Sequence, residues 1–186
     1  MQEFFTPARK QITKKGKNMI RKILAIASAL LCVALIIFIF SNSLDNAKES
    51  TEKSDAVYTT VNQIAKEIGI KQEISRSFIR QSAHFLEFTA LGISSALTLI
   101  FALLPSPKRK LSIKLTFIGT ALPFCALIAL IDEYIQTFSE GRVFDFADIL
   151  TDTAGALVGI IFILSVYLLV RLFYHTREKK LVTSSN

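Results

Sequence analysis

Polar side chains that could carry chemistry gather near the ends of long apolar runs in this sequence. Arg80, His84 and Glu87 are separated by four and three residues, so on a helix they share one face. An imidazole beside carboxylates can bind a divalent metal or act in acid–base catalysis, whereas guanidinium groups can hold an anionic head group. The other members of this candidate cluster follow later in the chain: Asp132, Glu133, Gln136, Arg142, Asp148 and Asp152.

The charges at the expected helix ends also allow a purely structural interpretation. Asp132 and Glu133 stand at the C-terminal end of one expected helix, where the helix dipole disfavours anions. Arg80 stands at the N-terminal end of another, where the dipole disfavours a cation. Arg80, or Arg142 from the next loop, could pair with one of these acids. Such a pair would offset the unfavourable interaction of each charge with its helix dipole and would hold two helices together. Because the HExxH signature of zinc enzymes is absent, no catalytic residue, metal or cofactor is predicted.

The elements that must position these residues are four apolar runs, at about 23–40, 83–104, 115–131 and 149–172. Each run is long enough to cross a bilayer core of roughly 30 Å as a helix. Lipid offers the backbone no hydrogen-bond partners, so each run is expected to be helical. The sequence therefore predicts an all-α membrane protein, with a bundle of four transmembrane helices over residues 23–172.

Basic residues predict the orientation of this bundle. The net charge is +7, and Lys and Arg concentrate in the tail 1–22, in the loop near 105–114 and in the tail 173–186. All three segments fall on one side of a four-span topology, and the positive-inside rule places that side in the cytoplasm. Both termini are thus expected in the cytoplasm of a multi-pass protein of the cell membrane. Because the charge lies beside the spans, a nucleic-acid partner is not expected.

Residues 41–77 form the longest polar segment and are expected to lie outside. Apolar residues recur there at helical spacing, and Ser54 and Gly69 are expected to begin and end a short amphipathic helix that lies on the membrane surface or across the mouth of the bundle. Span directions also place every member of the polar cluster at this outer end. The apolar stripe of the expected helix consists of Val57, Val61, Ile64, Ala65 and Ile68.

Two further features concern packing and the N-terminus. Thr151, Gly155 and Gly159 recur at four-residue spacing, so their small side chains predict a close helix–helix contact. Cys32 and Cys125 lie in the middle of apolar runs and are interpreted as apolar core residues rather than as a disulfide.

Residues 1–18 are expected to be a disordered tail before an uncleaved signal anchor, and the natural start remains open between Met1 and Met19.

Four polar stretches of the chain form a recognisable set: residues 40–43 (FSNS) at the end of the first run, residues 78–88 (FIRQSAHFLEF), residues 132–136 (DEYIQ) with Gly141 and Arg142, and Asp148 with residues 152–156 (DTAGA) and Gly159. Together they resemble the VanZ-like family of integral membrane proteins. The resemblance implies a bacterial protein of the cell envelope, since the founding member of the family is associated with low-level resistance to the glycopeptide teicoplanin.

The resulting functional hypothesis is a non-enzymatic envelope protein. It would bind or alter a membrane lipid of the outer leaflet or a lipid-like ligand through the polar cluster, for example a lipoglycopeptide or a lipid-linked cell-wall precursor. The alternative is a membrane-embedded enzyme, a hydrolase or transferase acting on a lipid-linked or phosphorylated substrate. A transporter is the least favoured class, because four short spans without an inverted repeat offer little for alternating access.

Overall fold

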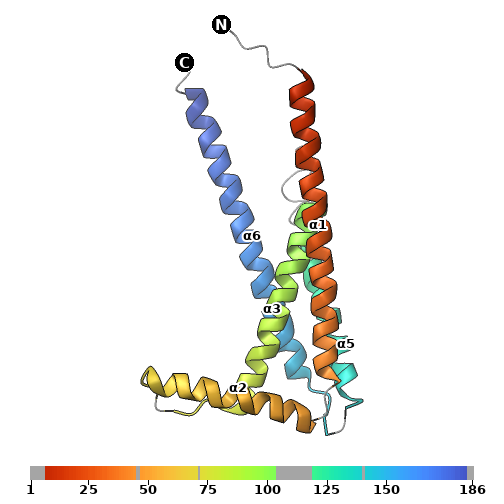
Figure 1. Cartoon of the computed structure of the whole chain (residues 1–186), viewed down its shortest axis with the longest axis vertical. Coiled ribbons are helices and arrows are strands. Elements are labelled where there is room, and N and C mark those ends of the chain that lie inside the picture. The colour runs from red at the N-terminus through yellow and green to blue at the C-terminus, as the bar shows by residue number, and fades with distance from the viewer. Residues whose placement is uncertain (1–6, 45–46, 71, 104–118, 140, 184–186) are drawn as a thin grey trace.

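The computed structural model describes residues 7–44, 47–70, 72–103, 119–139 and 141–183, and all regular structure in these ranges is helical. The prediction of an all-α protein is therefore confirmed for the described residues. Figure 1 shows the arrangement: α1, α3 and α6 run lengthwise, α5 lies beside them at one end, and α2 crosses that end. The helices are α1 (Pro7–Ser43), α2 (Ala47–Glu67), α3 (Arg76–Leu103), α5 (Ala121–Gln136) and α6 (Phe146–Thr183).

Three helices among the described residues are long and apolar enough to cross a membrane. These segments are Lys15–Ser43 of α1, Arg76–Ala102 of α3 and Phe146–Phe173 of α6, which coincide with three of the four predicted runs. The remaining run, predicted at 115–131, corresponds to the 16-residue helix α5, while residues 115–118 and the predicted basic loop lie outside the described residues. The chain is thus a helical membrane protein with three candidate spans.

The first and last helices extend well beyond the predicted spans. α1 already begins at Pro7, so the expectation of a disordered tail over residues 1–18 is wrong for its described part. Proline suits this first position, since the missing N–H would have no intrahelical partner there. α6 continues to Thr183, through most of the predicted tail. The beginning of α1 and the end of α6 lie at the same end of the molecule, opposite α2 (Figure 1).

α2 ends at the position that the sequence predicts but begins earlier in the chain than predicted. Gly69 has a positive φ of 89°, and its N–H and that of Ile70 donate to the carbonyls of Lys66 (3.1 Å) and Ala65 (2.8 Å). This pair of bonds is a Schellman motif, which glycine favours because it adopts positive φ without strain. Ser54 lies inside the helix, so its predicted role as the N-terminal cap is wrong.

The predicted apolar stripe of α2 faces away from most of the protein. Ala65 is buried, whereas Val57, Ile64 and Ile68 are 50%, 53% and 70% exposed. The helix is held instead through Asn62, whose amide both accepts from the N–H of Ile74 (2.8 Å) and donates to its carbonyl (3.2 Å). A helix tied down by polar bonds, with apolar side chains left exposed, is suited to lie on a membrane surface.

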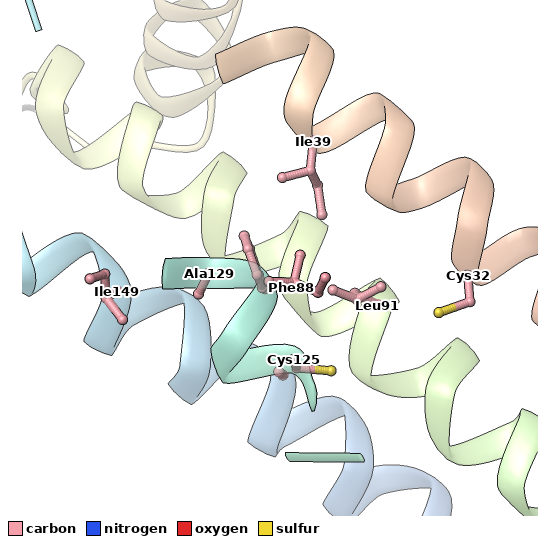
Figure 2. Close-up of a cluster of buried hydrophobic side chains, with 9 residues drawn as sticks. Cys32, Ile39, Phe88, Leu91, Cys125, Ala129 and Ile149 are labelled. Atoms are coloured by element: carbon pink, nitrogen blue, oxygen red, sulfur yellow. The ribbon is translucent and has the colours of Figure 1, made fainter. Parts of the chain in front are cut away.

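The apolar core is centred on α3 (Figure 2). Phe88 and Leu91 are fully buried there, and residues of the other three helices of the bundle surround them. Cys32 and Cys125 are buried free thiols within this core, as predicted, and their Sγ atoms lie 3.4 and 3.8 Å from Oγ of Ser95. The other labelled core residues are Ile39 of α1, Ala129 of α5 and Ile149 of α6.

α3 and α6 approach each other at backbone contact distance. A Cβ added to Gly155 or Gly159 would overlap the backbone carbonyl of Phe85 or Thr89, and one added to Gly92 would overlap that of Ala156. The hydroxyl of Thr89 lies 3.0 Å from the carbonyl oxygen of Gly155 and 2.7 Å from that of Phe85, its own preceding turn. Small residues are thus required on both helices for this approach.

We expect Gly155→Ala to separate these helices and lower stability by about 1–3 kcal/mol, the usual cost of overpacking. Gly16→Ala is the matched control, because nothing lies within 4 Å of a Cβ at Gly16 and alanine favours a helix. Thermal unfolding and folded yield of both variants in detergent would check this. Equal stability of Gly155→Ala and wild type would contradict the close contact.

Candidate functional site

Four helix ends converge at the end of the bundle near α2 (Figure 1). α1 and α5 end there, whereas α3 and α6 begin there, so their dipoles point in opposite senses. Side-chain bonds join the four ends, for example between Asn42 of α1 and Glu87 of α3 (3.2 Å) and between Ser43 of α1 and Asp132 of α5 (2.5 Å). The convergence brings the sequence-predicted polar cluster into one region.

Asp132 is fully buried and is bonded by uncharged donors. Its Oδ1 accepts from the hydroxyl of Ser43 (2.5 Å), and its Oδ2 accepts from the side-chain amide of Gln136 (2.9 Å). Gln136 in turn accepts from Nη1 of Arg142 (2.8 Å), and Ser139 donates to the backbone carbonyl of Ser43 (3.0 Å). Arg142 is therefore linked to Asp132 through an intervening amide rather than by the direct pair that the sequence suggested.

Glu133 is bonded to the beginning of α6. It is 2% exposed, and its Oε1 accepts from the backbone N–H of Asp145 (2.6 Å). Asp145 caps α6, because its Oδ1 accepts from the N–H of Ala147 (2.8 Å). The positive end of the α6 dipole thus lies beside an acid that the C-terminal end of α5 alone would disfavour.

Arg80 pairs with α6 rather than with α5. Its Nη2 lies 3.7 Å from Oδ2 of Asp148, so the predicted pairing of Arg80 with Asp132 or Glu133 is wrong. The reason is that α3 packs directly along α6 and both helices begin at the same end of the bundle (Figure 1). The arginine side chain is 46% exposed, and a pair this open to solvent contributes at most about 1 kcal/mol.

His84, Asp132 and Asp152 meet in the interior of the cluster. Their potential ligand atoms all lie within 4.8 Å of one another, and Nδ1 of His84 is 4.0 Å from Oδ2 of Asp152, too far for a hydrogen bond. Within the described ranges of the chain, Asp152 Oδ1, His84 Nδ1 and Glu87 Oε2 are buried without a hydrogen-bond partner. All nine predicted cluster residues lie at this end of the bundle, and the acceptor atoms just named on His84, Glu87 and Asp152 have unused bonding capacity.

Sequence reasoning missed three partners in the site: Asn42, Ser43 and Ser139. The first two carried a signal, because the polar stretch Ser41-Asn42-Ser43 directly follows an uninterrupted apolar run. They therefore had to lie at the same membrane depth as the cluster. Ser139 had no such signal, because a serine in a loop is ordinarily solvated.

Exposed apolar side chains border the polar cluster on the α5–α6 side. They stand at the end of α5, in the following loop and at the first position of α6, and Val143 is 85% exposed. The rings of Tyr134 and Phe138 pack edge to face, with their centroids 5.2 Å apart. A tyrosine beside polar groups, such as Tyr134, is typical of the interface between lipid and water. The exposed residues are Tyr134, Phe138, Val143, Phe144 and Phe146.

The fold and the site together define a helical membrane protein with a partly buried, charged cluster at one end of its bundle. Residues 28–171 match the model of the VanZ/LLP1 family, so the chain belongs to that family. The match includes the whole polar cluster, all of the candidate span in α3 and part of the candidate spans in α1 and α6. Neither a curated protein nor a solved structure matches the chain.

We expect Ser43→Ala to destabilise the protein by roughly 1–3 kcal/mol, because it removes a donor from the buried carboxylate of Asp132. Ser41→Ala is the matched control, since the exposed Ser41 hydroxyl bonds only to the carbonyl of Ile37 in its own helix. Thermal unfolding of both purified variants would check the difference. A Ser43→Ala variant as stable as Ser41→Ala would show that the Ser43–Asp132 bond contributes little.

Proposed function

We propose that this protein binds the head group of an outer-leaflet lipid or a lipid-like molecule at its polar cluster. The observation that carries the proposal is the border between the cluster and the exposed apolar side chains around the α5–α6 loop. A ligand with a charged head and an acyl chain would meet both surfaces at once. Arg80, half exposed at the N-terminal end of α3, is suited to contact an anionic group of such a ligand.

The proposal includes the topology, with α5 as part of a fourth span and both termini in the cytoplasm. Two observations support it. Basic residues concentrate in the N- and C-terminal regions, and the beginning of α1 and the end of α6 lie at the same end of the molecule (Figure 1). In this orientation the polar cluster and α2 face the outside, where an acylated glycopeptide or a lipid-linked cell-wall precursor is encountered.

A single-cysteine scan would test the topology, after replacement of Cys32 and Cys125. We expect Thr60→Cys, on an exposed position of α2, to react with a membrane-impermeant maleimide in intact cells. Thr176→Cys, on an exposed position near the end of α6, is the opposite-side control and should react only after lysis. Labelling of position 60 only after lysis would reverse the proposed orientation.

Membership of the VanZ/LLP1 family extends the proposal to glycopeptides such as teicoplanin. If the cluster binds or alters such a ligand, expression of the protein should reduce susceptibility to teicoplanin. We expect Arg142→Ala and Asp132→Asn to abolish that protection, because both residues belong to one hydrogen-bonded chain. Arg171→Ala, on an exposed position near the other end of α6, is the control and should behave as wild type.

The measurement is growth with and without teicoplanin at equal protein levels, verified by immunoblot. Equal susceptibility of cells with the wild type, with any variant and with an empty vector would remove the resistance role. Binding of a labelled lipid by the purified protein would then remain as the separate test of the ligand-binding proposal.

A membrane-embedded enzyme is the second candidate, acting on a lipid-linked or phosphorylated substrate. The observation in its favour is the buried His84 and Asp152 pair, whose free polar atoms could take part in acid–base chemistry. Turnover of such a substrate by the purified protein, with loss of turnover in His84→Ala, would distinguish the enzyme from a binding protein.

A further inference from the structure

Asp152 is a deeply buried carboxylate that forms no hydrogen bond with the residues that the structure describes. Only 2% of the residue is exposed, Oδ1 has no partner, and Oδ2 lies 4.0 Å from the nearby His84 Nδ1. Asp152 lies beyond the first turn of α6, so the free N–H groups at the helix end cannot serve it. Burial of an ionised carboxylate is costly unless a cation or hydrogen-bond donors compensate it.

Two further groups with unused lone pairs point into the same space. Nδ1 of His84 is buried without a partner, and the ligand atoms of His84, Asp132 and Asp152 lie within 4.8 Å of one another. Each oxygen of Asp132 accepts one hydrogen bond, which leaves each a second lone pair. The three groups come from α3, α5 and α6, so the packing of the bundle determines their spacing.

The local charge favours a cation in this space. Acids outnumber the arginines of the cluster, and Arg80 is already paired with Asp148, one turn before Asp152 on α6. Glu87 adds another buried oxygen without a hydrogen bond one turn along α3 from His84. An anionic group placed here would meet several carboxylates, whereas a divalent cation would offset them.

We propose that His84, Asp132 and Asp152 bind a divalent transition-metal ion, Zn²⁺ or Mn²⁺. One imidazole and two carboxylates suit these ions better than Mg²⁺ or Ca²⁺, which favour sites made of oxygen alone. Metal–ligand distances of about 2.0–2.2 Å require the three side chains to move closer together on binding. Glu87 is the candidate for a fourth ligand. The metal site is independent of the proposed lipid ligand and of any reaction.

The test uses the full chain, purified in detergent with a tag that contains no histidine and stripped with a chelator. Zn²⁺, Mn²⁺ or Mg²⁺ is then added, the excess is removed, and the retained metal is measured by mass spectrometry. We expect stoichiometric retention of Zn²⁺ or Mn²⁺ and little of Mg²⁺. Co²⁺ serves as a spectroscopic probe, because ligation by the site should produce saturable visible absorption. Absence of saturable binding by wild type for all these ions overturns the proposal without recourse to any variant.

Two matched variants assign the ligands. Asp152→Asn removes a ligand and should weaken binding by about tenfold or more, since changes even in the outer shell of metal sites cost that much. Asp145→Asn makes the same change at the cap residue of the same helix, and asparagine caps as well as aspartate, so metal affinity should be retained. Equal affinity in wild type and Asp152→Asn, or equal loss in both variants, contradicts the site. An Asp152→Asn variant more stable than metal-free wild type, with no metal bound by either, would indicate a neutral buried acid instead.

Discussion

The backbone contact between α3 and α6 is the constraint on which the site depends. Gly92, Gly155 and Gly159 let the helices approach until carbonyls occupy the positions that side chains would otherwise fill. In the bilayer, apolar surface alone gives helices little reason to associate, so this close packing and the Thr89 hydroxyl at the Gly155 carbonyl hold the pair together. The contact places the ionisable groups of α3 opposite those of α6.

The acids of α5 illustrate how buried charge is tolerated at a helix end. Asp132 and Glu133 lie where their own helix repels anions, yet neither has an arginine as its direct hydrogen-bond partner. Serine, glutamine and a backbone N–H at the start of α6 supply the compensation. The two arginines make other contacts instead: Arg80 pairs with Asp148 at the surface, and Arg142 donates a hydrogen bond to Gln136.

Much of the architecture could be predicted from the sequence, because apolar runs of this length with so few charges have few stable forms other than a membrane helix. The membership of the polar cluster was predictable for the same reason: charges beside such runs must share a depth. The pairing within the cluster was not predictable. Arg80 bonds to Asp148 because of the rotation of α3 against α6, which depends on the glycine contact and cannot be derived from span order. The start of α2 was also missed, since Ser54 resembles a cap but lies within the helix.

The two α5 acids gain their hydrogen-bond partners at different times during synthesis of the protein. Ser43, which bonds Asp132, precedes α5 in the chain, whereas the N–H of Asp145, which bonds Glu133, follows it. During translation Asp132 can therefore be satisfied as soon as α5 meets α1, but Glu133 must wait for the first turn of α6. Arg80 and His84, made much earlier, wait for the same segment. A nascent chain stalled before Asp145 would therefore hold Arg80, His84 and Glu133 without the partners that α6 and its cap residue supply.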